Sequence, residues 1–269
     1  MDATSKAFFK VSRSGTPSKK ERCKGKVTAD KLNVRSWAGR DSPTVSFSPL
    51  CIKDVVSVCD AILSDSGDIW YYIRYNGKYG FVNAKYIETF SKPQWIFLAC
   101  LKGIHKFVKA NPAYFGYRYD GSLTTFEKVK ERVAKKQIVG FTCLVPCRLA
   151  LKEAGVKRAD GKSLIAGYRG TFATTYTGEC KDYLTRMTRG DAIGKTVVQA
   201  VEKNLLKAGD IICFEDLTHT FVYSGDGFIM YDGGNASIKD GIYTGIRADY
   251  SKHYKNRRIS EILRWKQED

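Results

Sequence analysis

The sequence predicts an α+β protein in which a small all-β domain precedes a larger α+β domain. Short alternating strand patterns fill residues 25–90, apolar residues then recur at helical spacing, and further strand patterns follow the helices. Helices followed by a run of antiparallel strands are typical of the α+β class. We therefore expect a flexible basic arm at 1–24, an all-β domain at 25–91 and an α+β domain at 92–269.

The all-β domain is predicted from three segments. GKVTADKLNVRSWAG (25–39) and VVSVCDAIL (55–63) show strand patterns, and WYYIRYNGKYGFVNAKYI (70–87) places Asn76-Gly77 between two aromatic runs. Asn-Gly favours the positive φ angles of a two-residue hairpin loop. Short strands at this spacing predict a small barrel.

In the larger domain, Lys92-Pro93 marks the boundary. Helices are predicted in WIFLACLKGIHKFVKANP (95–112), in LTTFEKVKERVAKK (123–136) with Thr124 or Thr125 as the cap, and in TVVQAVEKNLLKAGD (196–210). Strands are predicted in IICFED, HTFVYSG and GFIMYDGG. The turn-rich segment 157–190 carries no clear pattern and is a candidate lid or specificity loop.

Charge and cysteine content narrow the function. Lys and Arg number 45 against 28 Asp and Glu, a net charge of +17, which favours polyanionic partners such as nucleic acid or bacterial wall polymers. The eight cysteines form no Cys-x-x-Cys pair and there are three histidines, so we expect neither a zinc site nor another cofactor. Cysteines inside apolar runs indicate buried thiols and a reducing site of synthesis.

The segment GFTCLVPCRLALKEAGV (140–156) carries a candidate nucleophile. Thr142 is the expected N-cap of a helix that has Pro146 in its first turn and Gly155 at its end. Cys143 would then lie at the helix N-terminus, where backbone N–H groups favour a thiolate and can hold an oxyanion. Cys147 lies one turn deeper and loses most of this effect. A packing role for Cys143 is the alternative.

His219 is the candidate base. It begins HTFVYSGDGFIMYDGG, in which a two-residue turn within SGDG places Asp232 on the same sheet face as His219. A three-residue loop would reverse that parity, so Asn235 is the alternative residue for orienting the imidazole. His105 and His253 lie in basic segments and are expected at the surface.

Two segments of the all-β region, LNVRSWAG and WYYIRYNGKYGFVNAKYI, resemble the bacterial SH3 (SH3b) domains attached to cell-wall hydrolases. The resemblance covers nearly all of 25–90 and implies a wall-targeting module. It makes four aromatic residues candidates for a binding surface, with barrel packing as the alternative role: Trp37, Trp70, Tyr72 and Tyr79.

Residues 95–240 resemble the papain-like, NlpC-type cell-wall cysteine peptidases through TCLVPCRLALKEAG, LKAGDIICFED and HTFVYSGDG. The resemblance implies Cys143 as nucleophile, His219 as base and a third polar residue at or next to Asp232, although the usual offset falls on Tyr231. GYRYDG (116–121) is similar to the family's tyrosine turn, which implies Tyr117 near the oxyanion. The residues around Cys143 depart from the family's usual Asp-Cys-Ser-Gly.

Together these resemblances imply an endolysin-like peptidoglycan hydrolase, either a cysteine endopeptidase or an N-acetylmuramoyl-L-alanine amidase. The expected partners are peptidoglycan and anionic wall polymers, with no nucleic acid or membrane. No secretory signal or membrane-length apolar run is present, so we expect synthesis in a bacterial host cytoplasm and action at the wall after release.

Two other functions remain open at this stage. A degenerate papain-like domain behind a binding module would give a non-catalytic wall-binding protein. The charge and the basic segment SKHYKNRR suggest nucleic-acid binding, but no nucleic-acid-binding fold supports it. The bond cleaved, the host and the oligomeric state are not indicated by the sequence.

Overall fold

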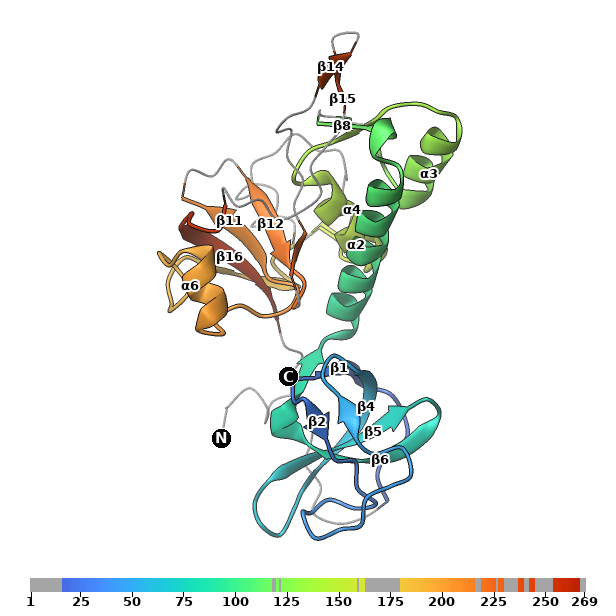
Figure 1. Ribbon diagram of the computed structural model, residues 1–269, viewed down its shortest axis with the longest axis vertical. Helices are drawn as coiled ribbons and strands as arrows, with labels where there is room; N and C mark the ends of the chain where they lie inside the picture. The colour runs from blue at the N-terminus through green and yellow to red at the C-terminus, as the bar shows by residue number, and fades with distance from the viewer. Residues whose placement is uncertain are drawn as a thin grey trace. The chain divides into compact units, whose positions relative to one another are not determined.

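The computed structural model describes residues 16–117, 120, 122–158, 160–162, 180–215, 219–225, 227–229, 237–239, 242–244 and 254–266. The chain divides into two compact units, one of residues 1–95 with 267–269 and one of residues 96–266 (Figure 1). Several sequence predictions lie outside the described residues: arm residues 1–15, segment 163–179, Asp232, Asn235 and His253.

The first unit is built on a five-stranded antiparallel sheet with the order β6-β5-β4-β1-β7. Its strands are β1 (Cys23–Val27), β4 (Val55–Leu63), β5 (Ile69–Tyr75), β6 (Lys78–Asn83) and β7 (Ile87–Phe90). A 3₁₀ turn, η1 (Ala84–Tyr86), precedes β7, and β2 (Lys31–Leu32) pairs with β3 (Leu50–Cys51).

The predicted hairpin is confirmed. Tyr75 pairs with Lys78, and the two loop residues, Asn76 and Gly77, have φ angles of 47° and 78°. Both are positive, as a two-residue loop that matches strand twist requires. No pairing among the described residues joins the edge strands β6 and β7, however, so the closed barrel expected from the sequence is not found.

The sheet of the first unit buries side chains on both faces. One face carries the main core, which includes Val58, Ile73 and Val82. The other face carries a smaller cluster of Ala38, Ile62, Trp70 and Phe81. The segment before β3 reaches this face, because Ala38 packs in the cluster, and the backbone of Arg35 pairs with that of Phe81 alongside β6.

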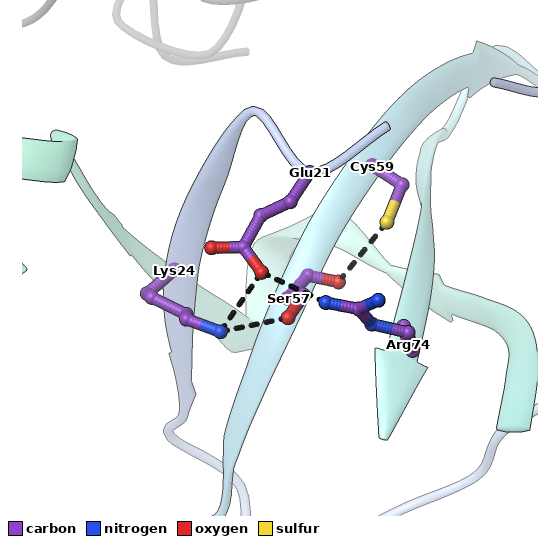
Figure 2. Close-up of polar contacts among 5 residues, drawn as sticks. All are labelled: Glu21, Lys24, Ser57, Cys59 and Arg74. Atoms are coloured by element: carbon purple, nitrogen blue, oxygen red, sulfur yellow. Dashed lines mark hydrogen bonds and ion pairs between the residues drawn. The ribbon is translucent and has the colours of Figure 1, made fainter. Parts of the chain in front are cut away.

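A polar network fastens three strands of the first unit (Figure 2). Glu21, which precedes β1, binds Lys24 at 2.9 Å and Arg74 of β5 at 3.2 Å. Lys24 also donates to the Ser57 hydroxyl of β4 at 2.8 Å. Burial opposes ionisation of Glu21, but hydrogen bonds with Ser57 and Lys24 and the nearby positive charges lower its pKa. The carboxylate is therefore the form that holds the strands together.

The second unit combines helices with a five-stranded antiparallel sheet in the order β10-β16-β11-β12-β13. These strands are β10 (Leu184–Met187), β11 (Ile211–Phe214), β12 (Thr220–Tyr223), β13 (Phe228–Ile229) and β16 (Ile259–Trp265). The helices are α2 (Lys92–Ala110), α3 (Phe126–Ala134), α4 (Val145–Glu153) and α6 (Val197–Glu202). Thr125 is the N-cap of α3, as expected.

Shorter elements complete the second unit: η2 (Pro112–Tyr114), the parallel pair β8 (Phe115–Tyr117) and β9 (Val139–Phe141), and the hairpin of β14 (Ser237–Lys239) and β15 (Ile242–Thr244). The mixed α and β content agrees with the predicted class. Two strands of the five-stranded sheet were not predicted: β10, which lies in the turn-rich segment, and β16, in the C-terminal region. The short strands β8, β9, β14 and β15 were not predicted either. In the ranges that the structure describes, no helix combines the length and apolar character needed to cross a membrane.

A buried ion pair ties β16 to the start of β11. Asp210 is 1% exposed and accepts hydrogen bonds from Arg264 Nε at 2.9 Å and Nη2 at 2.6 Å. Its Oδ2 also accepts from the Lys207 N–H at 2.8 Å, which closes a turn before β11. Burial raises the pKa of Asp210, while Arg264 and the turn N–H oppose that rise. Removing Arg264 would leave Asp210 buried without its counter-charge.

Candidate active site

Two parallel strands bring Tyr117 and Cys143 to one place. β8 and β9 pair in register, with Phe115 opposite Val139 and Tyr117 opposite Phe141. Parallel strands end at the same edge of a sheet, so the residues that follow them are neighbours. Tyr117 is the last residue of β8, and Cys143 follows the end of β9 by two residues.

The helix after Cys143 begins later than the sequence predicted. Its N-cap is Leu144 and its first residue is Val145, so the prediction of Thr142 as the cap is wrong. The cause is a turn in which the Val145 N–H donates to the Thr142 carbonyl at 3.3 Å, which uses the first donor before the helix starts. Pro146 lies in the first turn, and Gly155 ends the helix with a φ of 78°, both as expected.

The sulfur of Cys143 lies among several hydrogen-bond donors. Burial raises the pKa of the Cys143 thiol. Hydrogen bonds from the backbone of Thr220, from the Tyr117 side chain and from the backbone of Cys143 and Leu144 act in the opposite direction and do not overcome burial. This corrects the expected thiolate, because desolvation outweighs the donors at the helix start. The neutral thiol is the resting form, so reaction requires a base.

β12 supplies one of these donors through its backbone. The Tyr223 N–H donates to the Asp210 carbonyl at 2.9 Å, toward β11. N–H groups alternate in direction along a strand, so the Thr220 N–H, three residues earlier, faces away from β11. His219 immediately precedes Thr220 and is partly exposed. The predicted base therefore lies next in sequence to a residue that contacts the predicted nucleophile.

Aromatic rings surround the His219 imidazole. The Tyr117 ring lies 6.4 Å from it, and the Tyr254 ring lies 5.4 Å away at 78°, an edge-to-face arrangement. Tyr254 in turn stacks on Phe214 at 5.4 Å. The Arg257 guanidinium lies 4.9 Å from the centre of the Phe214 ring and 5.7 Å from that of Tyr254. Tyr254 thus fixes one side of the imidazole.

Tyr254 was not predicted as a site residue, because the segment SKHYKNRR has the composition of a basic surface segment. An aromatic residue within a run of charges was the one available signal. Cys213, by contrast, is a buried thiol as predicted, with no exposed surface. It stands opposite Thr220 in the β11–β12 register, and burial together with the charges of Glu261 and Cys143 raises its pKa to about 12.

The aromatic candidates of the first unit differ in exposure. Trp37 is 44% exposed and lies 5.0 Å from the Phe81 ring. Tyr72 and Tyr79 are partly buried and stack at 5.4 Å. Trp70 is 3% exposed and packs in the smaller cluster, so its ring does not form an open aromatic surface.

No group of three or more His, Cys, Asp or Glu side chains within the described residues could hold a metal ion. The arrangement at Cys143 is suited to nucleophilic chemistry, since a thiol, a neighbouring histidine and several N–H and O–H donors lie together.

No family model and no curated protein matches the chain. Similar solved structures include NlpC1 from Trichomonas vaginalis, with 15% identity, a TM-score of 0.29 and coverage of 90% of this chain and 69% of that one. NlpC2 from the same organism has 15% identity and a TM-score of 0.25, and the match covers 90% of this chain and 72% of that one. An NlpC/P60 family protein from Bacillus cereus ATCC 10987 has 13% identity and a TM-score of 0.27. The match covers 93% of this chain and 64% of that one, so this chain spans under two thirds of the length of that protein. All three TM-scores lie below 0.5.

Proposed function

We propose that this protein is an endolysin-like peptidoglycan hydrolase that cleaves an amide bond of the cell-wall stem peptide, with Cys143 as nucleophile and His219 as base. One observation carries the proposal. The Tyr117 side chain and the backbone of Thr220, the residue that follows His219, lie close enough to the Cys143 sulfur to lower its pKa as hydrogen-bond donors. A thiol, a histidine and donors for an oxyanion are the parts that acyl transfer through cysteine requires.

The reaction begins from the neutral thiol, because burial raises the pKa of Cys143. His219 takes the thiol proton as the sulfur attacks the amide carbonyl carbon. The carbonyl oxygen becomes an oxyanion that accepts hydrogen bonds from the Cys143 N–H and the Tyr117 hydroxyl. His219 then returns the proton to the leaving amine as the carbon–nitrogen bond breaks, which leaves a thioester.

The second half of the reaction reverses these roles. A water molecule gives a proton to His219 and attacks the thioester carbonyl, the carbon–sulfur bond breaks, and Cys143 regains its proton. The new carboxylate leaves with the cleaved peptide. Asp232 or Asn235 is the proposed third residue that orients His219, and both lie outside the described residues. Removing the thiol should lower the rate by about 10³-fold or more.

The first unit is proposed as an SH3b-like wall-targeting module. The exposed Trp37 and the stacked Tyr72 and Tyr79 support an aromatic contact surface, and the net charge of +17 supports binding to anionic wall polymers. Synthesis in a host cytoplasm and action at the wall after release belong to the same proposal. The second candidate function is a non-catalytic wall-binding protein, which is favoured by the raised pKa of Cys143.

Fragments released from purified Gram-positive peptidoglycan, identified by mass spectrometry, test the proposal. Wild type and Cys51→Ala, which removes an exposed thiol of the first unit, should both release fragments. Cys143→Ala should fold and bind the wall but release none. The new termini would distinguish an amidase from an endopeptidase.

Two results would reject the catalytic proposal. One is equal release by Cys143→Ala, which would remove this thiol from the mechanism. The other is retained wall binding without any release by wild type across several wall chemotypes. That second result would identify the chain as the non-catalytic binding protein.

A further inference from the structure

The first unit contains a basic cavity on the sheet face that carries the smaller cluster. Its volume is about 380 Å³, within the range of small-ligand pockets. Four cationic residues line it and no carboxylate does: Lys31, Arg35, Arg40 and Lys85. The cavity is separate from the residues around Cys143, all of which belong to the second unit.

Two largely buried side chains also line this cavity. Trp70 and Asn83 pair across β5 and β6, so their side chains share one face of the sheet. They are 3% and 7% exposed. Trp70 Nε1 has no hydrogen-bond partner within the described residues. Asn83 Oδ1 accepts from the Lys85 N–H at 3.1 Å, and its amide nitrogen donates to no residue that the structure describes.

The Asn83 amide nitrogen can only donate. It is not among the described side-chain atoms that are fully buried without a partner, so an acceptor atom in the cavity can reach it. The Trp70 indole N–H is covered by protein atoms, and Trp70 serves as a reporter because the residue lines the cavity.

The cations define the charge of that partner. The Arg35 guanidinium is held by a hydrogen bond from Nη1 to the Ser42 carbonyl at 2.6 Å. Arg40 lies 3.6 Å from Asp68, but its side chain is 68% exposed, so this pair neutralises little of the positive potential. The Lys85 ammonium lies 4.5 Å from the centre of the Tyr86 ring, at the cavity lining. A negatively charged group is the complement of this arrangement.

We propose that this cavity binds a small ligand through an oxyanion, either a carboxylate or a phosphate. The Asn83 amide donates to its oxygens, Lys85 and the two arginines balance its charge, and Trp70 lines the cavity beside them. The volume admits more than a lone ion, so part of the ligand beyond the oxyanion also enters. This binding site is independent of the proposed hydrolysis and needs no chemistry at Cys143.

Two-dimensional NMR of the full ¹⁵N-labelled chain tests the proposal through the Trp70 indole N–H resonance. Trp70→Phe assigns that resonance, or elimination with Trp37→Phe, Trp95→Phe and Trp265→Phe does so if the first variant does not fold. The probes are glycerol 3-phosphate, N-acetylalanine and its neutral counterpart N-acetylalaninamide. A saturable shift with the phosphate or the carboxylate, but not with the amide, is expected, and whichever anion acts identifies the group.

Variants sharpen this test. Lys85→Gln should weaken binding about tenfold, because it removes a charged partner of the oxyanion. Lys78→Gln removes an exposed charge from a residue that does not line the cavity and should change binding less than about twofold. Cys143→Ala should bind as wild type does, which separates this result from the fate of the catalytic proposal.

Three outcomes would overturn the inference. The first is the absence of a saturable Trp70 shift with either anion at millimolar concentration. The second is an equal shift with N-acetylalaninamide, which would show that charge is not recognised. The third is equal weakening by Lys78→Gln and Lys85→Gln, which would reduce the effect to the overall charge of the unit.

Discussion

Replacing Tyr117 with phenylalanine removes one hydrogen bond to the Cys143 sulfur and leaves an aromatic ring beside His219. A hydrogen bond to a charged group contributes about 1.5–3 kcal/mol, and each 1.36 kcal/mol changes a population about tenfold. The thiolate population of Cys143 at a fixed pH should therefore fall about 13- to 160-fold. The pKa of Cys143, already raised by burial, should rise further.

The reactivity of Cys143 should fall less than its thiolate population does. A thiolate with a higher pKa is a stronger nucleophile, with a Brønsted coefficient of about 0.4–0.5, so about half of the logarithmic loss is recovered. The net slowing of Cys143 alkylation by iodoacetamide should be about 4- to 16-fold near neutral pH. The rate of Cys143 alkylation should continue to rise to a higher pH in Tyr117→Phe than in wild type.

Mass spectrometry of the Cys143 peptide measures this rate, and the exposed Cys51 provides a reference in the same sample. The rate at Cys51 should be the same in both proteins. If Cys143 in Tyr117→Phe reacts at the wild-type rate relative to Cys51 and has the same pH profile, the Tyr117 hydroxyl does not stabilise the thiolate. The assignment of Tyr117 to the oxyanion would then lose its physical basis.

Three further predictions concern the second unit. Burial raises the pKa of Cys213 to about 12, so the folded protein favours the neutral thiol. The stability that this thiol contributes is present below the pKa of the unfolded thiol and is lost as the pH rises toward about 12. Between about pH 8 and about pH 10.5, the free energy of unfolding in urea should fall by about 2 kcal/mol more in wild type than in Cys213→Ala. Equal losses in the two proteins would refute this reasoning. Arg264→Met should cost about 3–5 kcal/mol at neutral pH because it leaves Asp210 buried without its counter-charge, and adding Asp210→Asn should recover part of that loss. Tyr254→Ala should slow peptidoglycan hydrolysis about two- to tenfold, and it should also lower the urea midpoint because it loses the stacking on Phe214, so the rate is measured where the variant is folded. Tyr254→Phe keeps both ring contacts and should act as wild type; equal rates in all three proteins would exclude the contact with His219 from positioning the imidazole.

The features that the sequence predicted well are those fixed by local backbone chemistry. Asn76-Gly77 specifies its loop because both residues adopt positive φ angles, and Gly155 ends its helix for the same reason. β16 could not be recognised in this way, since Ile259, Ile262 and Leu263 are buried at a spacing that also fits a helix. It is a strand because β10 and β11 pair with it on both sides, which is a tertiary effect.

The same distinction between local and tertiary effects applies to the candidate site. Residue type and motif order pointed to Cys143, His219 and Tyr117, and the structure brings these elements together. The direction of the Cys143 pKa was not predictable, because desolvation depends on what the folded unit packs over the thiol. Tyr254 reaches His219 through the fold, and no local pattern connects the two residues.

The smaller cluster of the first unit adds a related case. Trp70 and Tyr72 lie two residues apart on one strand face, so alternation assigns them the same surroundings. Trp70 is buried in a cluster with Ala38, while Tyr72 is only partly buried against it. The difference in burial between the two side chains comes from the segment that precedes β3. Strand periodicity does not predict where such a segment packs on the sheet.

Three of the hydrogen-bonding groups around the Cys143 sulfur belong to the main chain, at Thr220, Cys143 and Leu144. Alanine scanning leaves such donors in place and would therefore underestimate their role. Proline is the informative replacement at Thr220 and Leu144, because it deletes the N–H itself. For the same reason, evolution can vary the side chains flanking the sulfur while its donors persist, provided that the strand, turn and helix keep their path. The unusual Thr-Cys-Leu-Val sequence at 142–145 is compatible with that freedom.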